Sequence, residues 1–129
     1  MKKVISSNAA PIAVGAYSQA IVSNSLLFTS GQLPINPKDG VLITGDIKAA
    51  TKQSMDNIGA ILEAANLSYS DIVKTVIYLK NIADFALVNE VYQSYFTDCF
   101  PARSCFEVSA LPKNADIEIE VIANKGGNS

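Results

Sequence analysis

Arg103 is the side chain best suited to bind a small anion, and it stands in the segment Pro101-Ala102-Arg103-Ser104-Cys105. A planar guanidinium can donate two parallel hydrogen bonds to a carboxylate, and the nearby proline restricts the backbone that carries it. A surface arginine paired with a neighbouring acid is the simpler interpretation. Spacing alone favours that simpler interpretation, so a binding role for Arg103 needs further support.

Glu118 and Glu120 are candidate acid–base groups because they alternate with apolar residues along a predicted strand. A carboxylate on a strand face can orient a water molecule or accept its proton, and partial burial raises the pKa of such a group usefully. A solvated strand face that carries alternating acids explains the same pattern. On the sequence alone this second explanation is preferred.

Three further positions are weaker candidates for a site. A thiolate at Cys105, favoured by the adjacent Arg103, would be a nucleophile, but a strand cysteine is more often a small buried side chain. The glycine of the Ser30-Gly31 step allows a ligand to approach the backbone N–H, although a bulge or turn explains it equally well. Tyr17 either offers its hydroxyl to a ligand or packs at an edge.

The composition excludes several classes of site. The chain of 129 residues contains no histidine, which removes Ser–His–Asp and Cys–His nucleophilic sites and histidine-ligated zinc. Its cysteines, Cys99 and Cys105, do not form a Cys-x-x-Cys pair, and two thiols alone do not make a structural zinc site. The net charge of −2 argues against nucleic acid as a partner. We therefore expect chemistry without a metal or a cofactor.

The elements that must position these groups are short strands and two helices. The first helix begins near Asp46, follows a 3.6-residue apolar period, and ends before Asn66, which tolerates a left-handed cap. Asp84 can cap a second helix that extends to about Phe96. The apolar stripe of this second helix consists of Phe85, Val88, Val91, Tyr92, Tyr95 and Phe96. Strands are predicted over residues 20–22, 26–29, 72–79, 104–108 and 116–122.

The resulting order, β-β-α-β-α-β-β, predicts an α+β fold with both helices on one face of the sheet. In the last strand Ile117, Ile119 and Val121 point one way, and the acidic residues between them point the other way. We expect the helices to cover the aliphatic side. The acidic side then faces water, or another subunit together with a ligand.

We expect one domain over residues 1–129, with a loose tail at residues 124–129. The basic N-terminus is not followed by the apolar core of a signal peptide, and no apolar stretch approaches the roughly 20 residues that span a bilayer. The expected location is therefore the cytoplasm, with both cysteines reduced and no membrane partner.

Motifs over essentially the whole chain resemble the reactive-intermediate deaminase family, also called the YjgF or Rid family. The most specific match is the segment of residues 101–113 together with residues 117–123, which resembles the C-terminal signature of the family. Four supporting motifs occur in the expected order, at Gly15-x-Tyr17-Ser18-Gln19 and at residues 29–34, 53–58 and 88–92.

The resemblance implies a chorismate-mutase-like fold assembled as a homotrimer, with three clefts between neighbouring subunits that cover the polar sheet face. It also implies an activity, the hydrolysis of 2-imino acids derived from 2-aminoacrylate and 2-aminocrotonate. The products are a 2-oxo acid and ammonia. Small 2-imino and 2-oxo carboxylic acids are therefore the implied ligands.

The resemblance assigns roles residue by residue. Arg103 matches the arginine that binds the substrate carboxylate, and Glu118 matches the acid that positions or activates water, with Glu120 behind it. Tyr17 matches a tyrosine that lines the cleft from across the subunit boundary. The remaining matches are Gly31, as a backbone donor to the ligand next to Ser30, and Asn89 and Cys105, which line or border the site.

Two hypotheses from different classes remain at this point. The first is an imine deaminase that depends on Arg103. The second is a non-catalytic, ligand-sensing or regulatory trimer that binds small 2-oxo acids in the same cleft, a class that includes the translation-inhibitor and ribonuclease descriptions of the family. Ribonuclease action is disfavoured by the negative net charge and the lack of histidine. Turnover, as opposed to binding alone, separates the two hypotheses.

Overall fold

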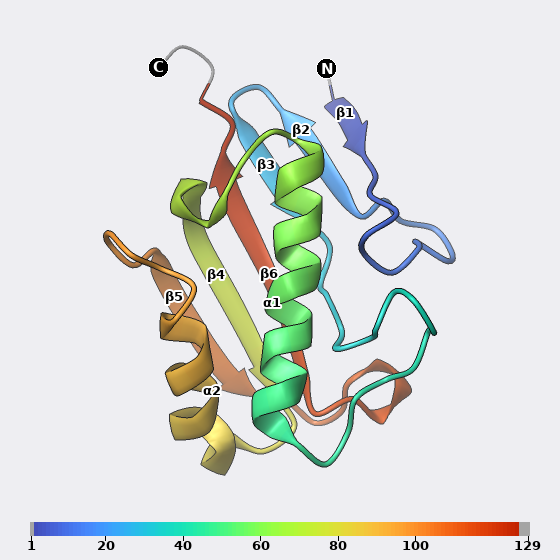
Figure 1. The fold of residues 1–129 in the computed structure, drawn as a ribbon, viewed down its shortest axis with the longest axis vertical. Helices are drawn as coiled ribbons and strands as arrows, with labels where there is room; N and C mark the ends of the chain where they lie inside the picture. Colours follow the sequence, from blue (N-terminus) through green and yellow to red (C-terminus); the bar gives the residue numbers. More distant parts are fainter. Residues whose placement is uncertain (1, 127–129) are drawn as a thin grey trace.

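The computed structural model describes residues 2–126 as a six-stranded sheet with two α-helices in front of it (Figure 1). The strands are β1 (Lys2–Ile5), β2 (Ala20–Ser23), β3 (Leu26–Thr29), β4 (Ile72–Leu79), β5 (Ala102–Glu107) and β6 (Ile117–Asn124). The α-helices are α1 (Ile47–Ala64) and α2 (Phe85–Gln93), and short 3-10 helices lie at η1 (Tyr69–Asp71), η2 (Ile82–Asp84) and η3 (Pro112–Asn114). The predicted α+β class is confirmed.

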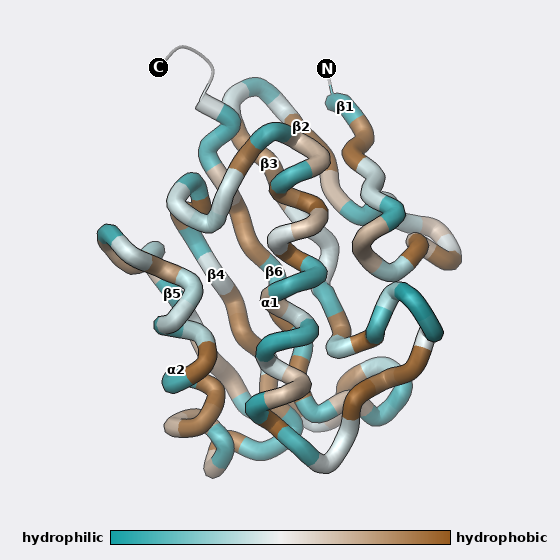
Figure 2. Tube along the Cα trace, viewed as in Figure 1, coloured by the Kyte–Doolittle hydropathy of each residue, from teal (hydrophilic) through white to brown (hydrophobic). Residues whose placement is uncertain are grey.

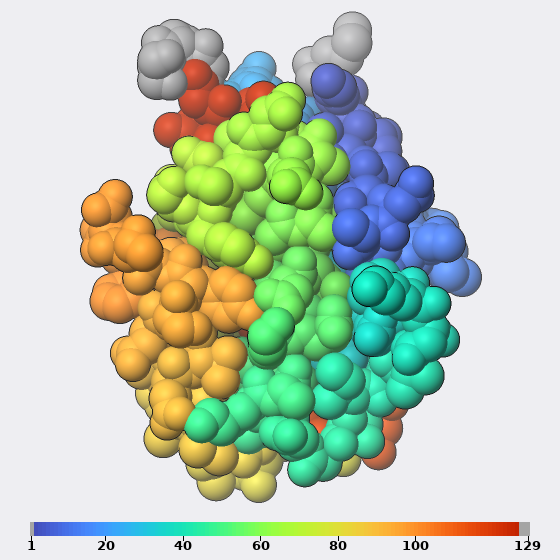
Figure 3. Space-filling model, in the orientation of Figure 1, coloured from blue at the N-terminus to red at the C-terminus, as the bar shows by residue number. Residues whose placement is uncertain are grey.

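The spatial order of the strands is β1-β2-β3-β6-β4-β5. Strand β4 pairs in parallel with β5, and the other neighbours pair antiparallel. In the space-filling view α1 occupies the middle of the helix side, between α2 with β5 and the segment that follows β3 (Figure 3). Residues 2–126 therefore make two layers, and none of their helices covers the second face of the sheet.

Strand β1 is absent from the predicted order, which is a correction. It pairs with β2 from Lys2↔Ser23 to Ile5↔Ala20. Only Ile5 of its four residues is buried, so the segment lacks the alternating apolar pattern by which a strand is recognised in a sequence. The strand forms because β2 offers a free edge beside it.

Two predicted strand boundaries also move. Strand β5 begins at Ala102 rather than at residue 104, because its parallel pairing with β4 starts at Lys74↔Ala102. Strand β6 begins at Ile117 and continues to Asn124, where it pairs with Leu26. Asn124 therefore belongs to the sheet and not to the expected tail, of which residues 127–129 lie outside the described residues.

Helix α1 begins where predicted. The side chain of Asp46 accepts a hydrogen bond from the Ala49 N–H at 3.1 Å, and Asn66 follows the helix with a φ of 61°. Hydrophobic residues lie on the strands behind α1, whereas its outward turns are hydrophilic (Figure 2). Its buried face includes Met55, Ile58 and the amide side chain of Asn57.

Helix α2 ends at Gln93, three residues before the predicted end. Of the predicted stripe only Val88 and Tyr92 are buried, and Phe85 is 37% exposed. The physical reason is that α2 lies at the β5 edge of the sheet, where less of its surface is covered. Tyr95 and Phe96 follow the helix in a tighter turn and pack with Tyr69 in an aromatic cluster.

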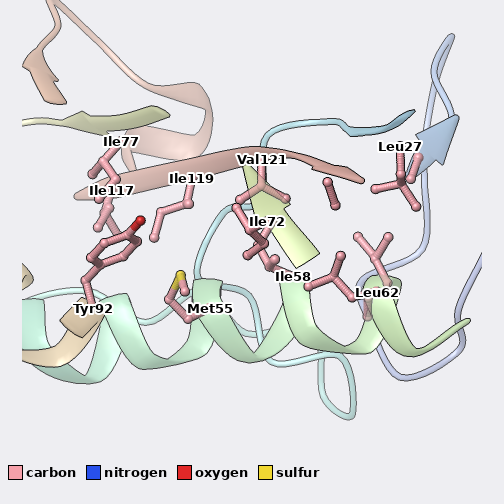
Figure 4. Close-up of a cluster of buried hydrophobic side chains, with 14 of the residues drawn as sticks. Leu27, Met55, Ile58, Leu62, Ile72, Ile77, Tyr92, Ile117, Ile119 and Val121 are labelled. Carbon is pink, nitrogen blue, oxygen red and sulfur yellow. The ribbon is translucent and has the colours of Figure 1, made fainter. Parts of the chain in front are cut away.

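The core lies between α1 and the strands β6 and β4, as Figure 4 shows. Met55, Ile58 and Leu62 point from α1 toward Ile119 and Val121 of β6. Burial of this aliphatic row fixes which face of β6 meets the helices, so Glu118 and Glu120 must project from the other face. None of the helices within residues 2–126 is both long and apolar enough to cross a membrane.

The face without helices is not purely acidic. By the alternation of side chains it also carries Val4, Phe28 and Phe106, which are 57, 41 and 53% exposed. Apolar side chains of this size on one sheet face mark a surface that another protein surface can cover.

The side chain of Asn57 links α1 to the segment that follows β3, and substitution of Asn57 tests how much these hydrogen bonds stabilise the fold. Its Nδ2 donates to the carbonyl oxygens of Leu33 and Ile35 at 3.2 and 3.0 Å. We predict that Asn57→Ala lowers the free energy of unfolding by about 1–3 kcal/mol, because the partly buried Ile35 carbonyl loses its side-chain donor and the Leu33 carbonyl keeps only the Ile35 N–H. Urea denaturation measures this loss. The exposed Glu63→Ala on the same helix should change it by less than about 0.5 kcal/mol, and equal losses would contradict the prediction.

Candidate functional site

A cavity of about 470 Å³ lies beside the end of β3. Four predicted site residues, Tyr17, Ser30, Gly31 and Glu118, line it together. The rest of its wall comprises Pro11, Ile12, Val14, Gln32, Leu33, Ile35, Pro112 and Lys113. This mostly apolar wall was not predicted, because its residues lie in loops and in the short helix η3, where no periodicity marks them.

The cavity is open because the chain leaves the regular ladder after β3. Thr29 Oγ1 accepts the Val121 N–H at 3.0 Å, in place of a backbone carbonyl. Backbone pairing with β6 resumes when the Gln32 N–H donates to the Ile119 carbonyl at 2.7 Å. Between these points the chain carries one residue more than β6, which is a β-bulge. The bulge places Gly31 against the acidic face of β6.

The Glu118 side chain occupies the space beside the Gly31 backbone that a Cβ would fill. A Cβ at position 31 would overlap the Glu118 carboxylate, so any larger residue displaces that group. Within residues 2–126 the Gly31 N–H has no acceptor. A ligand in this cavity can therefore meet a free backbone donor and a carboxylate side by side.

The Glu118 carboxyl is half-buried, and burial raises its pKa above the ordinary value. The negative charge of Glu120 on the same strand face raises that pKa further. Glu120 is itself held by the Tyr78 hydroxyl, which donates to its Oε1 at 3.1 Å. A carboxylate with a raised pKa is a stronger base, which suits Glu118 to accept a proton from water.

The wall of the cavity is fixed by Gln19, to which sequence analysis gave no separate role. Its buried amide accepts the Ser7 N–H at 2.6 Å and donates to the carbonyl oxygens of Ser7 and Pro11 at 3.1 and 2.7 Å. The Ser30 hydroxyl donates to the Ser18 carbonyl at 2.6 Å. The role of Gln19 could have been suspected from a glutamine next to a predicted strand, because its side-chain amide can bond both N–H and carbonyl groups of a loop.

Arg103 lies at a second cavity of about 250 Å³. Its Nη1 donates to Asn89 Oδ1 at 2.7 Å, and its guanidinium carbon lies 5.1 Å from the ring centroids of both Phe85 and Tyr92. The ion pairs within residues 2–126 are Lys48–Glu90 and Lys52–Asp56, so the simple surface pair considered for Arg103 is not formed there.

Arg103 and Glu118 do not meet within one chain, because they project from opposite faces of the sheet. Arg103 is in register with Thr75 of β4, which is buried on the helix side and accepts the Tyr92 hydroxyl at 2.9 Å. Glu118 is in register with Tyr78, three residues further along β4 and thus on the other face. The predicted site residues therefore form two separate groups in one copy.

Cys105 belongs to the Arg103 side of the sheet. It is in register with Ile77 and packs against the hydrophobic core. Burial raises the pKa of its thiol more than the nearby Arg103 lowers it. The thiol is therefore protonated near neutral pH, as expected for a half-buried cysteine with a packing role rather than for a nucleophile.

No group of three or more histidine, cysteine, aspartate or glutamate side chains within residues 2–126 is arranged to hold a metal ion. The ionisable and hydrogen-bonding groups that line the two cavities include the Arg103 guanidinium, the Lys113 ammonium, the Glu118 carboxylate, the hydroxyls of Tyr17 and Tyr92, and the free N–H of Gly31.

The family model described as Endoribonuclease L-PSP matches residues 7–125. A 2-iminobutanoate/2-iminopropanoate deaminase of Escherichia coli K12 is 48% identical, with 95% of this chain and 98% of that protein covered. A RutC family protein of Pyrococcus horikoshii is 53% identical over 97% of this chain and 99% of its own. The chain belongs to the Rid (YjgF, endoribonuclease L-PSP) family.

The fold agrees with this membership. The crystal structure of a Rid family protein from Yersinia pestis superposes with a TM-score of 0.94 at 50% identity, covering 96% of this chain and 99% of that one. The resemblance seen in the sequence is thus confirmed. The Rid match begins at residue 7, so strand β1 precedes the part of the chain that the family model describes.

The electrostatic coupling between the two glutamates of this Rid chain can be tested directly. We predict that Glu120→Gln lowers the pKa of Glu118 toward its ordinary value, because a like charge is removed. Carbon-13 NMR titration of the glutamate carboxyl groups measures this shift. An exposed acid far from the cavity, changed in Glu63→Gln, should leave the Glu118 pKa where it is.

The sign of the accompanying stability change is fixed by linkage. A carboxyl whose pKa is raised by folding favours the folded state when protonated, so stability falls as the pH rises through the folded pKa. Glu120→Gln should make the free energy of unfolding decrease less as the pH rises through the pKa of Glu118. An unchanged Glu118 titration in this variant would contradict the coupling.

Proposed function

We propose that this chain is an enzyme that hydrolyses 2-imino acids, formed from 2-aminoacrylate and 2-aminocrotonate, to 2-oxo acids and ammonia. The observation that carries the proposal is the only arginine of the sequence, half-buried at a cavity and without a carboxylate partner in residues 2–126. Such a charge suits the carboxylate of a small acid. The name of the Escherichia coli relative supports the same reaction.

The complete site is proposed to form between copies of the chain in a homotrimer. Arg103 of one copy would face the cavity of Tyr17, Gly31 and Glu118 in its neighbour. Two observations support this arrangement: the groups lie on opposite sheet faces within one copy, and the face without helices exposes large apolar side chains. The same association would cover the half-buried acids.

The chemistry needs only water as a co-reactant. Arg103 holds the substrate carboxylate, which fixes the electrophilic C=N carbon beside an ordered water. Water adds to that carbon while Glu118 accepts its proton, and the same proton then returns to the nitrogen. Glu118 then transfers the remaining hydroxyl proton to the nitrogen, so that the C=O bond forms, the C–N bond breaks and ammonia leaves. Because such imines also hydrolyse unaided, modest acceleration is sufficient.

The other predicted site residues would support this reaction. The free N–H of Gly31 would donate to the ligand, with Ser30 holding the bulge and Tyr17 lining the cleft. Asn89 would act on Arg103, and Cys105 would border the site without reacting. The cytoplasm is the proposed location, in keeping with two free cysteines.

A regulatory or ligand-sensing trimer is the second candidate, favoured by the description of the family as an endoribonuclease. The same Arg103 would then hold a 2-oxo acid without turnover. Phosphodiester cleavage itself is a poor fit, because the chain has a net charge of −2 and no histidine.

Loss of the arginine tests the proposed reaction. We predict that Arg103→Ala lowers kcat/KM by about a hundredfold or more, because the carboxylate loses its charged partner. The assay couples a threonine dehydratase, which generates the imine, to detection of the 2-oxo acid. Arg103→Lys should also fail substantially, because an ammonium lacks the planar fork.

The matched control for the lost charge is Lys38→Ala, an exposed cation outside both cavities, which should keep full activity. Retained turnover in Arg103→Ala, with the oligomer intact by analytical ultracentrifugation, would overturn the assignment.

Mixing two inactive variants tests whether the site is shared. We predict that Arg103→Ala and Glu118→Gln, unfolded and refolded together, regain measurable turnover that neither shows alone. In a mixed trimer some clefts would combine an intact Arg103 with an intact Glu118 of the neighbour. The control refolds each variant separately. A mixture as inactive as its components would contradict a site built from two copies.

A further inference from the structure

The guanidinium of Arg103 has an unusual set of neighbours for a half-buried cation. Phe85, Asn89 and Tyr92 stand at positions i, i+4 and i+7 of α2, on the helix face that meets β5. Two of them offer aromatic rings and the third offers a neutral amide oxygen. None of them carries a negative charge.

This set of contacts stabilises the cation without neutralising it. An aromatic ring attracts a guanidinium through its quadrupole, and an amide oxygen accepts one of its five N–H groups. A carboxylate at the same place would form a bidentate pair and would compete with any anionic ligand. The choice of neighbours therefore keeps the charge of Arg103 available.

We propose that Phe85, Asn89 and Tyr92 form a cradle on α2 that orients the Arg103 guanidinium and keeps it unpaired for a ligand carboxylate. The identity of that ligand rests on the proposed function, but the arrangement of the cradle does not. Phe85 and Asn89 are thus positioning residues, which act on the ligand through Arg103.

The two aromatic residues of the cradle differ in how well the fold would tolerate their substitution. Tyr92 is 2% exposed, its hydroxyl donates to Thr75, and its ring packs on Phe96 with centroids 4.9 Å apart. Replacing Tyr92 would disturb the core. Phe85 is 37% exposed, so it can be changed while the fold is retained.

Asn89→Asp tests whether Arg103 must stay without a charged partner, or whether any hydrogen-bond acceptor at position 89 is sufficient. The two side chains have nearly the same shape, but aspartate would pair with Arg103 and repel a second carboxylate. We expect KM for the imine to rise about tenfold or more, with kcat changed less than about twofold. If Asn89 only supported the fold, the stronger pair would leave KM unchanged, and that result would overturn the proposal.

The matched control is Asn81→Asp. Asn81 is exposed and caps η2 through its side chain, a role that aspartate performs equally well. It adds the same charge just before α2 and should leave KM unchanged. An equal rise in both variants would indicate a general charge effect and would also overturn the proposal.

Phe85→Leu tests the aromatic wall with a readout that is independent of activity. Because Arg103 is the only arginine, its side-chain Nε–H gives one assignable arginine signal in a proton–nitrogen NMR spectrum. Loss of the ring current should move this signal, and KM should rise about three- to tenfold. Phe85→Tyr, which retains a ring, should restore both. Leu87→Ala, on the same helix and outside the Arg103 cavity, should change neither.

The cradle and the proposed reaction can be disproved separately. Should Arg103→Ala abolish turnover while Phe85→Leu moves neither the NMR signal nor KM, the cradle is wrong and the proposed reaction stands. Should the wild type show no turnover, the Nε–H signal and the dissociation constant for pyruvate still test the cradle. In that case an unchanged pyruvate affinity in Asn89→Asp would overturn it.

Discussion

The alternation of side chains across the pleated sheet is the constraint from which the site geometry follows. The aliphatic row of β6 must face α1, so Glu118 projects from the other side. Arg103 follows the register of buried Thr75 and therefore lies on the helix side. A single copy separates its cation from its carboxylate by the thickness of the sheet. The proposed cooperation of these two groups therefore depends on the proposed assembly and not on local folding.

The two helices have different tasks in this scheme. Almost the whole inner face of helix α1 packs in the core. Its one buried side-chain amide, Asn57, donates hydrogen bonds to the segment that leads away from the bulge. Helix α2 is shorter and less covered, and it uses two rings and an amide to hold a charge. Toward the β5 edge of the sheet, the helix contributes less to the hydrophobic core and more to the contacts that hold the Arg103 charge.

Much of this arrangement could be predicted from the sequence. The periodicity of α1, the cap at Asp46 and the alternation in β6 are local signals, and the structure follows them. Strand β1 was not predicted, because one buried residue in four gives no alternating pattern. A bulge was one of the two explanations considered for the Ser30-Gly31 step, but a Ser-Gly step does not reveal that the Glu118 side chain occupies the missing Cβ position. Residue types indicated the chemistry, whereas the separation of the groups required the register of the strands.

The short strand β1 has a consequence for the protein in concentrated solution. It forms one outer edge of the sheet, and an unpaired edge is a template on which another chain can add a strand. Here that edge is only four residues long and carries the exposed lysines Lys2 and Lys3. A second copy docking there would bring its own lysines close to these. Charge repulsion thus discourages the open-ended addition of strands at this edge of the sheet.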